Sequence, residues 1–492
     1  MTVYLVGAGP GGPELLTVRA LRLLERADLV VHDRLVDRGT LELVRAGAEL
    51  VDVGKSPFVG GASQESINAL LIERGRSELV VRLKGGDPYV FGRGGEEALA
   101  LESAGVAYEV VPGVSAVAAV PAAAGVPLTM RKLTSTVVVV TGHDPDGATS
   151  SPIAWDALGG DAATIVFVMA VAQRAEIAKR LIAAGRSPST PAVVIERGAT
   201  PELVSHRTTL SELGALAVTS PATIVVGEVA SLELASIEAR QLHGRRIALT
   251  RARGESAELA DLLADAGARV LEVPTIELAR DADGLDALRV ALGGELPAWI
   301  VCTSPHGAEA LFEAVLDARA LGGVRVGAVG PATAARLLSF GVRADLVASP
   351  ASVKGLLEGF PRPELGDARV VYPRARGASP ELAEGLRAIG YDVDDPVVYE
   401  TRPRRVDPTE RDELLGADAI VLSSPSALLG LLGAVARFEI QAALVTIGPT
   451  TSAAVRAEGL VVAAESAEPS AEALLVAVRS LLGPRGGGSL HS

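Results

Sequence analysis

Short apolar runs rich in Val and Ile alternate along the chain with longer stretches in which Leu and Ala recur among charged residues. The first pattern predicts buried strands, and the second predicts amphipathic helices such as residues 13–25 and 96–103. In the first half, strands are expected at residues 3–6, 29–32, 79–83, 136–141, 164–169, 192–196 and 223–226. This alternation favours an α/β protein with mostly parallel sheets.

A polar stretch at residues 238–246 marks a domain boundary, because a fresh strand follows it at residues 247–250. A chain of 492 residues is also too long for one hydrophobic core. We therefore predict one domain over residues 1–240 and another over residues 245–482. The Gly-rich polar tail, residues 483–492, is expected to be disordered.

Composition narrows the classes of partner. The formal net charge of −14 argues against a general nucleic-acid binder, although a few local Arg residues can still hold a small anion. A single cysteine, Cys302, excludes an intramolecular disulfide and suits a reducing compartment. The longest apolar stretch, residues 114–128, is interrupted by Ser, Pro and Gly. We expect a soluble cytoplasmic protein with no membrane partner.

The second half contains a duplication. The segment IALTRARG (247–254) recurs as VVYPRARG (370–377), and CTSP (302–305) recurs as LSSP (422–425). VGPATA (329–334) then recurs as IGPTTS (447–452). The order is kept with an offset of about 120 residues, which indicates two copies of one α/β unit facing each other across a cleft. A duplication retained only for folding stays open as an alternative.

A glycine-rich turn, GAGPGG (7–12), follows the first strand and opens a helix. It satisfies the dinucleotide-binding spacing, and Asp33 stands where such a fold places its ribose-binding acid. An NAD-dependent dehydrogenase is therefore one alternative. A tight turn that merely needs glycine is another, since Pro10 is unusual in a phosphate-binding loop.

Two further loops decide between these alternatives. RLKGGDPYVFGRGGEE (82–97) and VPGVSA (111–116), together with DRL (33–35) and VGK (53–55), resemble the tetrapyrrole methylase family over residues 2–235. Within that family the chain most resembles uroporphyrinogen-III C-methyltransferase. The resemblance implies a two-lobed fold, S-adenosylmethionine as cofactor, and a homodimer formed through this half.

The resemblance also implies site residues. The S-adenosylmethionine site would be lined by Pro10, Gly85, Gly86, Asp87, Val90, Ser115, Ala116, Met169 and Gly198. Asp33 would accept a proton and Lys55 would donate one, while Arg34, Arg93 and residues 130–132 would meet substrate carboxylates. The chemistry suits these residue types, because methylation of a pyrrole carbon builds positive charge that a nearby carboxylate relieves by taking a proton. Guanidinium groups bind carboxylates bidentately.

Plainer roles stay open for the same residues. Asp33 would also serve as a turn cap, Lys55 as a solvated lysine, and Met169 as a core residue. Two departures from the family pattern concern the cofactor loops. Gly12 stands where relatives usually carry Asp, and Ala170 follows Met169 where Gly is common.

The duplicated half resembles uroporphyrinogen-III synthase over residues 245–482, on IGPTT (447–451), EPS (468–470), VYET (398–401) and SSPS (423–426). The resemblance implies two α/β lobes joined by a two-stranded connector, with lobe one at residues 245–278 plus 402–482 and lobe two at residues 279–400. It implies cyclisation of hydroxymethylbilane with inversion of ring D, without a metal or organic cofactor.

For this half the resemblance implies that Tyr399 assists departure of the hydroxyl group. Ser304, Thr333, Ser424 and Thr450 would hydrogen-bond substrate carboxylates. Ser304 and Ser424 suit helix capping equally well, because each precedes a proline at a predicted helix start. The Arg residues of the two RARG segments are predicted to be solvated surface more than anion contacts.

The whole chain is thus predicted to be a bifunctional enzyme that makes uroporphyrinogen III and methylates it to precorrin-2, in the siroheme and cobalamin branch. Its partners would be small tetrapyrrole substrates. The alternative is a methyltransferase fused to a catalytically inert tetrapyrrole-binding module.

Overall fold

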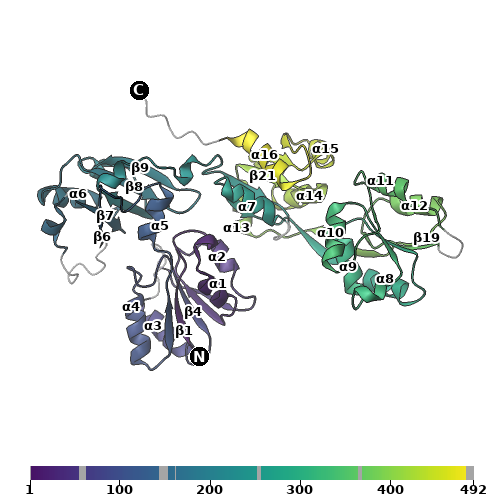
Figure 1. Cartoon of the computed structure of the whole chain (residues 1–492), viewed down its shortest axis with the longest axis horizontal. Coiled ribbons are helices and arrows are strands. Elements are labelled where there is room, and N and C mark those ends of the chain that lie inside the picture. Colours follow the sequence, from purple (N-terminus) through teal and green to yellow (C-terminus); the bar gives the residue numbers. More distant parts are fainter. Residues whose placement is uncertain are drawn as a thin grey trace. The chain divides into compact units, whose positions relative to one another are not determined.

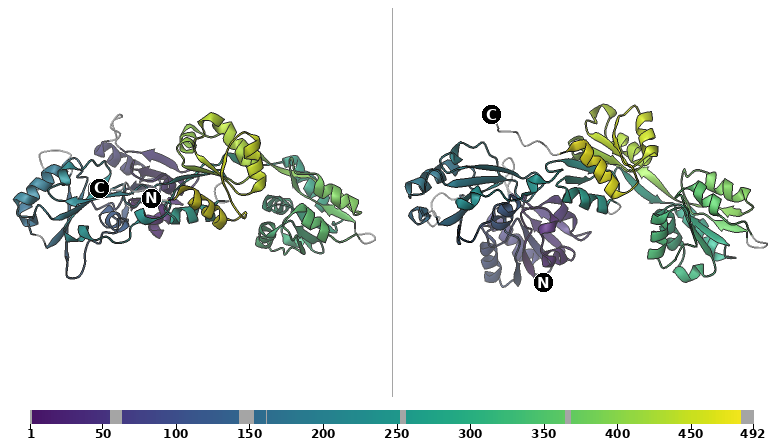
Figure 2. Two further views of the ribbon diagram at one scale, coloured as in Figure 1. Left: turned by 90° about the horizontal axis from the view of Figure 1, so that it is seen from above. Right: turned by 45° about the horizontal axis from the view of Figure 1, so that its top comes forward.

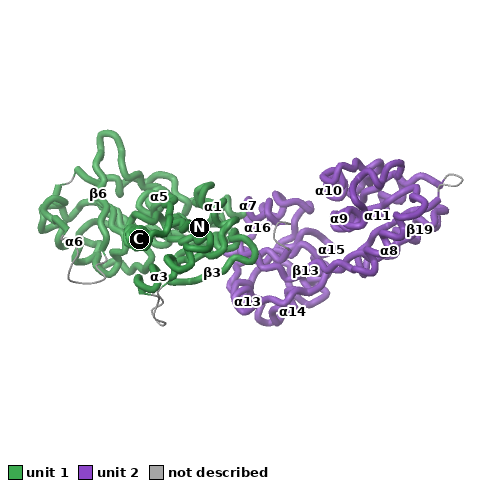
Figure 3. The backbone as a smooth tube through the Cα atoms, turned by 90° about the horizontal axis from the view of Figure 1, so that it is seen from below, with its two compact units in different colours: residues 1–245, 263–269, 482–492 green, residues 246–262, 270–481 purple. Residues whose placement is uncertain are grey.

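Five β-sheets form where the sequence concentrates β-branched residues, in the part of the chain that the computed structural model describes (Figure 1). That part comprises residues 2–54, 63–142, 153–160, 162–251, 256–363 and 368–483. The backbone divides into two compact units (Figure 3). Unit 1 comprises Met1–Arg245, Leu263–Arg269 and Leu482–Ser492, and unit 2 comprises Arg246–Leu262 and Val270–Leu481. The limits of the domains within these units stay a prediction.

The first sheet of unit 1 has the strand order β3-β2-β4-β1-β5, and all its paired strands are parallel. Its strands are β1 (Val3–Gly7), β2 (Leu29–His32), β3 (Glu49–Asp52), β4 (Val80–Lys84) and β5 (Tyr108–Val111). The helices around it are α1 (Val18–Leu24), α2 (Arg38–Glu42), α3 (Gln64–Arg74) and α4 (Gly94–Ser103). Alternate residues of β1 enter two separate cores, so the strand is apolar throughout.

The second sheet of unit 1 has the order β6-β7-β10-β8-β9. It comprises β6 (Thr136–Thr141), β7 (Ala163–Val168), β8 (Pro191–Glu196), β9 (Val204–Thr209) and β10 (Ala222–Val226). Helices α5 (Ala116–Ala123) and α6 (Arg174–Ala183) contribute to the cores on its two faces.

This second sheet differs from the predicted parallel arrangement. Only β6 and β7 run parallel, while β7–β10, β10–β8 and β8–β9 are antiparallel. For β8 and β9 the physical reason is connection length, because the short link between them closes a hairpin, whereas parallel neighbours need a long crossover.

Unit 2 contains two sheets of five strands and a smaller sheet of three. The first, β12-β11-β21-β22-β23, comprises β11 (Arg246–Leu249), β12 (Arg269–Glu272), β21 (Ala419–Leu422), β22 (Ala443–Thr446) and β23 (Val462–Glu465). Its helices are α7 (Ala257–Asp265), α13 (Pro408–Leu415), α14 (Pro425–Ala434), α15 (Pro449–Ala457) and α16 (Ala471–Leu482). The sheet therefore takes its strands from two separate parts of the sequence.

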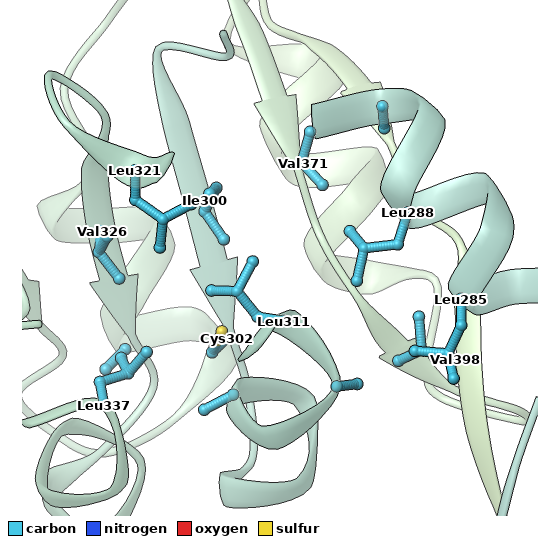
Figure 4. Close-up of a cluster of buried hydrophobic side chains, with 14 of the residues drawn as sticks. Leu285, Leu288, Ile300, Cys302, Leu311, Leu321, Val326, Leu337, Val371 and Val398 are labelled. Atoms are coloured by element: carbon cyan, nitrogen blue, oxygen red, sulfur yellow. The ribbon is translucent and has the colours of Figure 1, made fainter. Parts of the chain in front are cut away.

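The second sheet of unit 2, β16-β15-β14-β17-β19, uses the residues in between and is parallel throughout. Its strands are β14 (Trp299–Cys302), β15 (Arg325–Ala328), β16 (Leu346–Val347), β17 (Arg369–Val371) and β19 (Asp392–Asp394). Its helices are α8 (Ala282–Gly293), α9 (Pro305–Ala314), α10 (Pro331–Ser339), α11 (Val353–Gly359) and α12 (Glu381–Ala388). Leu288, Cys302, Leu311 and Val398 meet in one core beside this sheet (Figure 4).

Two antiparallel strands, β13 (Ile276–Arg280) and β20 (Val397–Pro403), carry the chain between the two large sheets of unit 2 (Figure 2). They form the predicted two-stranded connector. A short third strand, β18 (Arg374–Ala375), pairs in parallel with β20 and was not predicted. Among the described residues, no helix is both long and apolar enough to cross a bilayer.

Candidate active sites

Three glycine-bearing turns meet at the carboxyl ends of β1, β4 and β5, which are neighbours in the first sheet. Gly86 donates its backbone N–H to the carbonyl of Gly9 at 2.8 Å, and Gly9 donates to the carbonyl of Gly86 at 3.2 Å. A Cβ on Gly7 would lie 2.5 Å from both the Gly86 carbonyl oxygen and the Gly113 Cα. The close approach of three backbones explains why glycine stands at these positions.

Asp87 joins the second turn to the third. Its Oδ2 accepts the backbone N–H of Gly113 at 3.0 Å, while its Oδ1 accepts that of Tyr89 at 2.8 Å. In the third turn, Ser115 caps α5 by accepting the backbone N–H of Val117 at 3.3 Å. The two predicted cofactor residues Asp87 and Ser115 therefore organise the backbone of these turns.

The same turns leave room on one side. Among the described residues, a Cβ on Gly85 would meet only Leu35 Cβ at 3.6 Å, and one on Gly86 would meet only the Ala116 nitrogen at 3.7 Å within contact range. Gly198 lies against Val120 of α5, which brings the loop after β8 to the third turn. Glycine edges with little protein beside them fit the close approach of an adenosyl group.

Strained backbone gathers in the loops predicted to bind ligands. The described non-glycine residues with positive φ are Phe91, Arg93, Lys132, Met169, Arg197 and Ala199. All lie in unit 1, in the loops that carry the predicted Val90, Arg93, Met169 and Gly198 or in residues 130–132. Met169, at φ 54° and 49% exposed, is not a core residue. Such conformations cost stability and persist mainly at functional sites.

Asp33, the predicted proton acceptor, directly follows β2 and is held by a buried guanidinium. Nη2 of Arg82 donates to its Oδ1 at 2.5 Å. The Arg82 side chain is 3% exposed and that of Asp33 is 34% exposed. Arg82 thus fixes one carboxylate oxygen of Asp33, while the Asp33 side chain remains partly exposed to solvent.

Arg82 belongs to a buried charge cluster that the sequence analysis missed. Glu97 is fully buried, and its Oε1 accepts Arg82 Nε at 3.0 Å and Lys84 Nζ at 2.8 Å. The available signal was the i, i+2 spacing of two cations in an otherwise apolar strand, since residues two apart share one face. The cluster is the support on which Asp33 rests.

The pKa values of the two cations in the cluster shift in opposite directions. Burial lowers the pKa of Lys84, and the neighbouring Arg82 adds to that effect. Burial also acts against the charged form of Arg82, but Asp33 and Glu97 outweigh it and raise its pKa. Arg82 therefore stays a permanent cation beneath Asp33.

The other predicted methylase residues are less constrained. Lys55 lies outside the described residues, but a Cβ on Gly54 before it would contact the backbone and Cβ of Arg34. Arg34 is exposed in the turn after β2. Arg93 donates to Glu96 at 2.7 Å and 2.9 Å on the protein surface, so part of its hydrogen-bonding capacity is already used.

The two departures from the family pattern have local explanations. A Cβ on Gly12 would contact the carboxylate of Glu14, so an acid still lies in this turn although Gly12 has none. Ala170 is fully buried against Gly142. A Cβ added to Gly142 would lie 2.5 Å from Ala170 Cα. Gly142 thus accommodates the extra methyl group.

In unit 2, Ser304 and Ser424 cap equivalent helices. Ser304 Oγ accepts the backbone N–H of Gly307 at 3.0 Å, and Ser424 Oγ accepts that of Ala427 at 3.1 Å. Thr333 is buried at the start of α10, whereas Thr450 is exposed at the start of α15. These side chains lie where helix starts also present backbone N–H groups, which suits anions.

Tyr399 lies on β20 and is 7% exposed. Its hydroxyl is 2.8 Å from Ser304 Oγ, although 95 residues separate the two in sequence. Burial raises the pKa of Tyr399, so the phenol stays protonated at neutral pH. The structure therefore brings two of the predicted synthase residues together.

Both Arg residues of the second RARG segment, Arg374 and Arg376, form ion pairs. Arg374 donates to Asp395 at 2.8 Å, and Arg376 pairs with Asp281 and Glu400. They fasten the connector strands to their surroundings, and their side chains already have acidic partners.

Comparison with known proteins assigns a family to each half. The family model described as "Tetrapyrrole (Corrin/Porphyrin) Methylases" matches residues 2–214. The model described as "Uroporphyrinogen-III synthase HemD" matches residues 257–476.

Related proteins cover either most of the chain or about half of it. A "Porphyrin biosynthesis protein HemD" of Ruminiclostridium josui is 34% identical over 410 residues, which are 81% of each chain. An "S-adenosyl-L-methionine-dependent uroporphyrinogen III methyltransferase" of Methanosarcina barkeri is 43% identical over 47% of this chain and 92% of that protein. A "Siroheme synthase" of Chromobacterium violaceum is 46% identical over 47% of this chain, and the match spans 50% of that protein.

Two solved structures each match about half of the chain. The uroporphyrin-III C-methyl transferase of Thermus thermophilus complexed with S-adenyl homocysteine is 44% identical, with a TM-score of 0.41 over 46% of this chain and 98% of that chain. A mutant uroporphyrinogen III synthase of Thermus thermophilus is 20% identical, with a TM-score of 0.36 over 49% of this chain and 99% of that chain.

Proposed function

The chain belongs to the tetrapyrrole methylase family through its first half and to the uroporphyrinogen-III synthase family through its second, and on this premise we propose a bifunctional enzyme of tetrapyrrole biosynthesis. Its second half would cyclise hydroxymethylbilane to uroporphyrinogen III. Its first half would methylate that product to precorrin-2, in the branch that leads to siroheme and cobalamin. The observation that supports this most directly is the convergence of the three glycine turns beside Asp33.

In the methylase half, S-adenosylmethionine would supply an electrophilic methyl group. The turn residues would hold it, with Gly85 and Gly86 offering backbone edges and Met169 an exposed apolar side chain. Asp33 would accept the proton that the substrate carbon loses, because it is partly exposed while Arg82 fixes one of its oxygens. Pro10, Asp87, Val90, Ser115, Ala116 and Gly198 would complete the cofactor site.

The tetrapyrrole carries many carboxylates, and cations near Asp33 suit them. Arg34 is exposed and adjoins Asp33 in the sequence, and Arg131 and Lys132 are exposed in the segment before β6. Arg93 would need to exchange its Glu96 partner for a substrate carboxylate. Lys55, outside the described residues, stays the proposed proton donor.

In the synthase half, the substrate loses a hydroxyl group and closes through an azafulvene-like cation. Tyr399 would hydrogen-bond the departing oxygen, since its buried phenol keeps its proton at neutral pH. Ser304, Thr333, Ser424 and Thr450 would bind substrate carboxylates, with help from the backbone N–H groups of their helix starts.

Two assays test the proposal. The full chain should convert hydroxymethylbilane to the type III isomer, and formation of only type I at the spontaneous rate would leave the second half as an inert tetrapyrrole-binding module. With uroporphyrinogen III and S-adenosylmethionine, the chain should produce precorrin-2. Calorimetry should detect binding of S-adenosylhomocysteine and no binding of NADH. Binding of NADH without binding of S-adenosylhomocysteine would favour the dehydrogenase alternative.

We further propose that the methylase half forms a homodimer and that the protein works in the cytoplasm. The first proposal is supported by family membership and the second by the single buried cysteine, Cys302, which suits a reducing compartment. Light scattering coupled to size exclusion should give a dimer mass, and fractionation of cells should place the protein with cytosolic markers.

A further inference from the structure

His306 and Glu309, which lie beside Tyr399, have no role in the proposed reaction so far. His306 lies in the first turn of α9, and its ring approaches the Tyr399 ring edge-on, with centroids 5.7 Å apart and planes at 68°. His306 Nδ1 is 3.2 Å from Glu309 Oε2, one helical turn further on. The Tyr399 hydroxyl is 2.8 Å from Ser304 Oγ. An imidazole, a phenol and an aliphatic hydroxyl therefore share one corner, where α9 begins against β20.

Glu309 is held as an anion in this corner. Arg280 of β13 donates to its Oε2 at 3.2 Å, and Arg336 of α10 donates to its Oε1 at 3.0 Å. Burial acts to raise the pKa of Glu309, but the hydrogen bond from His306 and the two guanidiniums outweigh it and lower that pKa. An ionised carboxylate one turn along the helix stabilises a protonated imidazole.

The net charge of this group of side chains depends on whether His306 is protonated. Arg280 also pairs with Glu313 of α9 at 2.6 Å, so two guanidiniums, those of Arg280 and Arg336, face two carboxylates. These four charges cancel, and Tyr399 is a neutral phenol. Protonation of His306 therefore adds a positive charge next to Tyr399, the residue predicted to contact the leaving hydroxyl.

We propose that His306 is the general acid of the synthase half, which rests on the proposed function of that half. The proton of the imidazolium passes to the hydroxyl oxygen of hydroxymethylbilane as the carbon–oxygen bond breaks, and water leaves. The electron pair of the adjacent pyrrole nitrogen forms the new double bond of the azafulvenium cation. The neutral imidazole of His306 then regains a proton from solvent, so the step consumes no other reactant.

Imidazole suits this task better than the neighbouring phenol. Burial raises the pKa of Tyr399, which makes the phenol a weaker acid than usual. General acids work best when they titrate near the working pH, and histidine is the side chain that ordinarily does so. Tyr399 then orients the departing oxygen by a hydrogen bond, and His306 supplies the proton.

The test uses the full chain with His306→Gln and His306→Ala and measures formation of uroporphyrinogen III from hydroxymethylbilane. Since general acid catalysis contributes about 10²–10⁴-fold, kcat should fall about 100-fold in either variant with KM changed less than about threefold. The decline of wild-type kcat at alkaline pH should vanish in His306→Gln. Imidazole added to the buffer should restore turnover to His306→Ala, which a purely structural role would not permit.

Controls separate the possible outcomes. Ser426 occupies in α14 the position that His306 occupies in α9, two residues after the capping serine. Ser426→Ala should therefore leave kcat unchanged. Wild-type protein that forms only the type I isomer would refute the synthase proposal itself. With an active wild type, a His306→Gln variant within twofold of its kcat and with the same alkaline decline would overturn the role of His306. Loss of that decline in Tyr399→Phe instead would assign the proton to the phenol.

Discussion

Glu97→Gln is the substitution to which the buried cluster of the methylase half should be most sensitive. The carboxylate is fully buried and accepts hydrogen bonds from both Arg82 and Lys84, whose side chains are 3% and 2% exposed. The amide would leave two buried cations with Asp33 as their remaining counter-charge. Removing one partner of a buried ion pair costs about 3–5 kcal/mol.

Deprotonation of Lys84 limits the part of this loss that comes from Lys84. A lysine that loses its counter-charge sheds its proton when that costs less than staying charged. Taking an ordinary lysine from a pKa of about 10.4 to neutrality at pH 7 costs about 4.6 kcal/mol, at about 1.36 kcal/mol per pH unit. Burial already lowers the pKa of Lys84 in the native protein, so part of this cost is already present there and the further loss from Lys84 should stay below this limit.

Calorimetry of the full chain measures the effect, with the methylase transition identified by its upward shift on addition of S-adenosylhomocysteine. For a domain of this size, 3–5 kcal/mol corresponds to about 6–20 °C in Tm. The stability of the variant should also rise between pH 7 and pH 10, because the unfolded chain then binds one more proton, on Lys84, than the folded chain does.

Glu96→Gln is the matched control, since Glu96 is the neighbouring residue and pairs with Arg93 on the surface, where both side chains are about half exposed. Such a pair contributes less than about 1 kcal/mol. Adding Lys84→Met to Glu97→Gln should recover much of the lost stability. The reasoning is refuted if Glu97→Gln melts within about 2 °C of wild type.

Other substitutions test the remaining parts of the two sites. Asp33→Asn should lower methyl transfer while leaving the Kd for S-adenosylhomocysteine nearly unchanged, and unaltered turnover would show that the carboxylate is not the base. Asp87→Ala removes the hydrogen bond to Gly113, so that Kd should rise about tenfold in calorimetry, whereas an unchanged Kd would exclude this link. Burial raises the pKa of the Cys302 thiol to about 12, so iodoacetamide should label it only after unfolding, and rapid labelling of native protein would contradict its burial.

The sequence by itself determined most of the local structure. Strands, turns and helix caps depend on residues near one another, so the glycine turns, the capping Ser304 and Ser424, and the duplicated order of unit 2 followed from spacing alone. The family resemblance added candidate roles for residues such as Asp33 and Tyr399, because it rests on motifs long enough to be specific.

Only the tertiary structure decided which distant groups meet. Fifteen residues separate Arg82 from Glu97, and 49 separate it from Asp33, so the support beneath Asp33 exists only after the sheet and α4 assemble. The contact of Tyr399 with Ser304 spans 95 residues. The antiparallel strands of the second sheet likewise depend on how connections close in space, because pairing energy is shared among strands and is not encoded in any one of them.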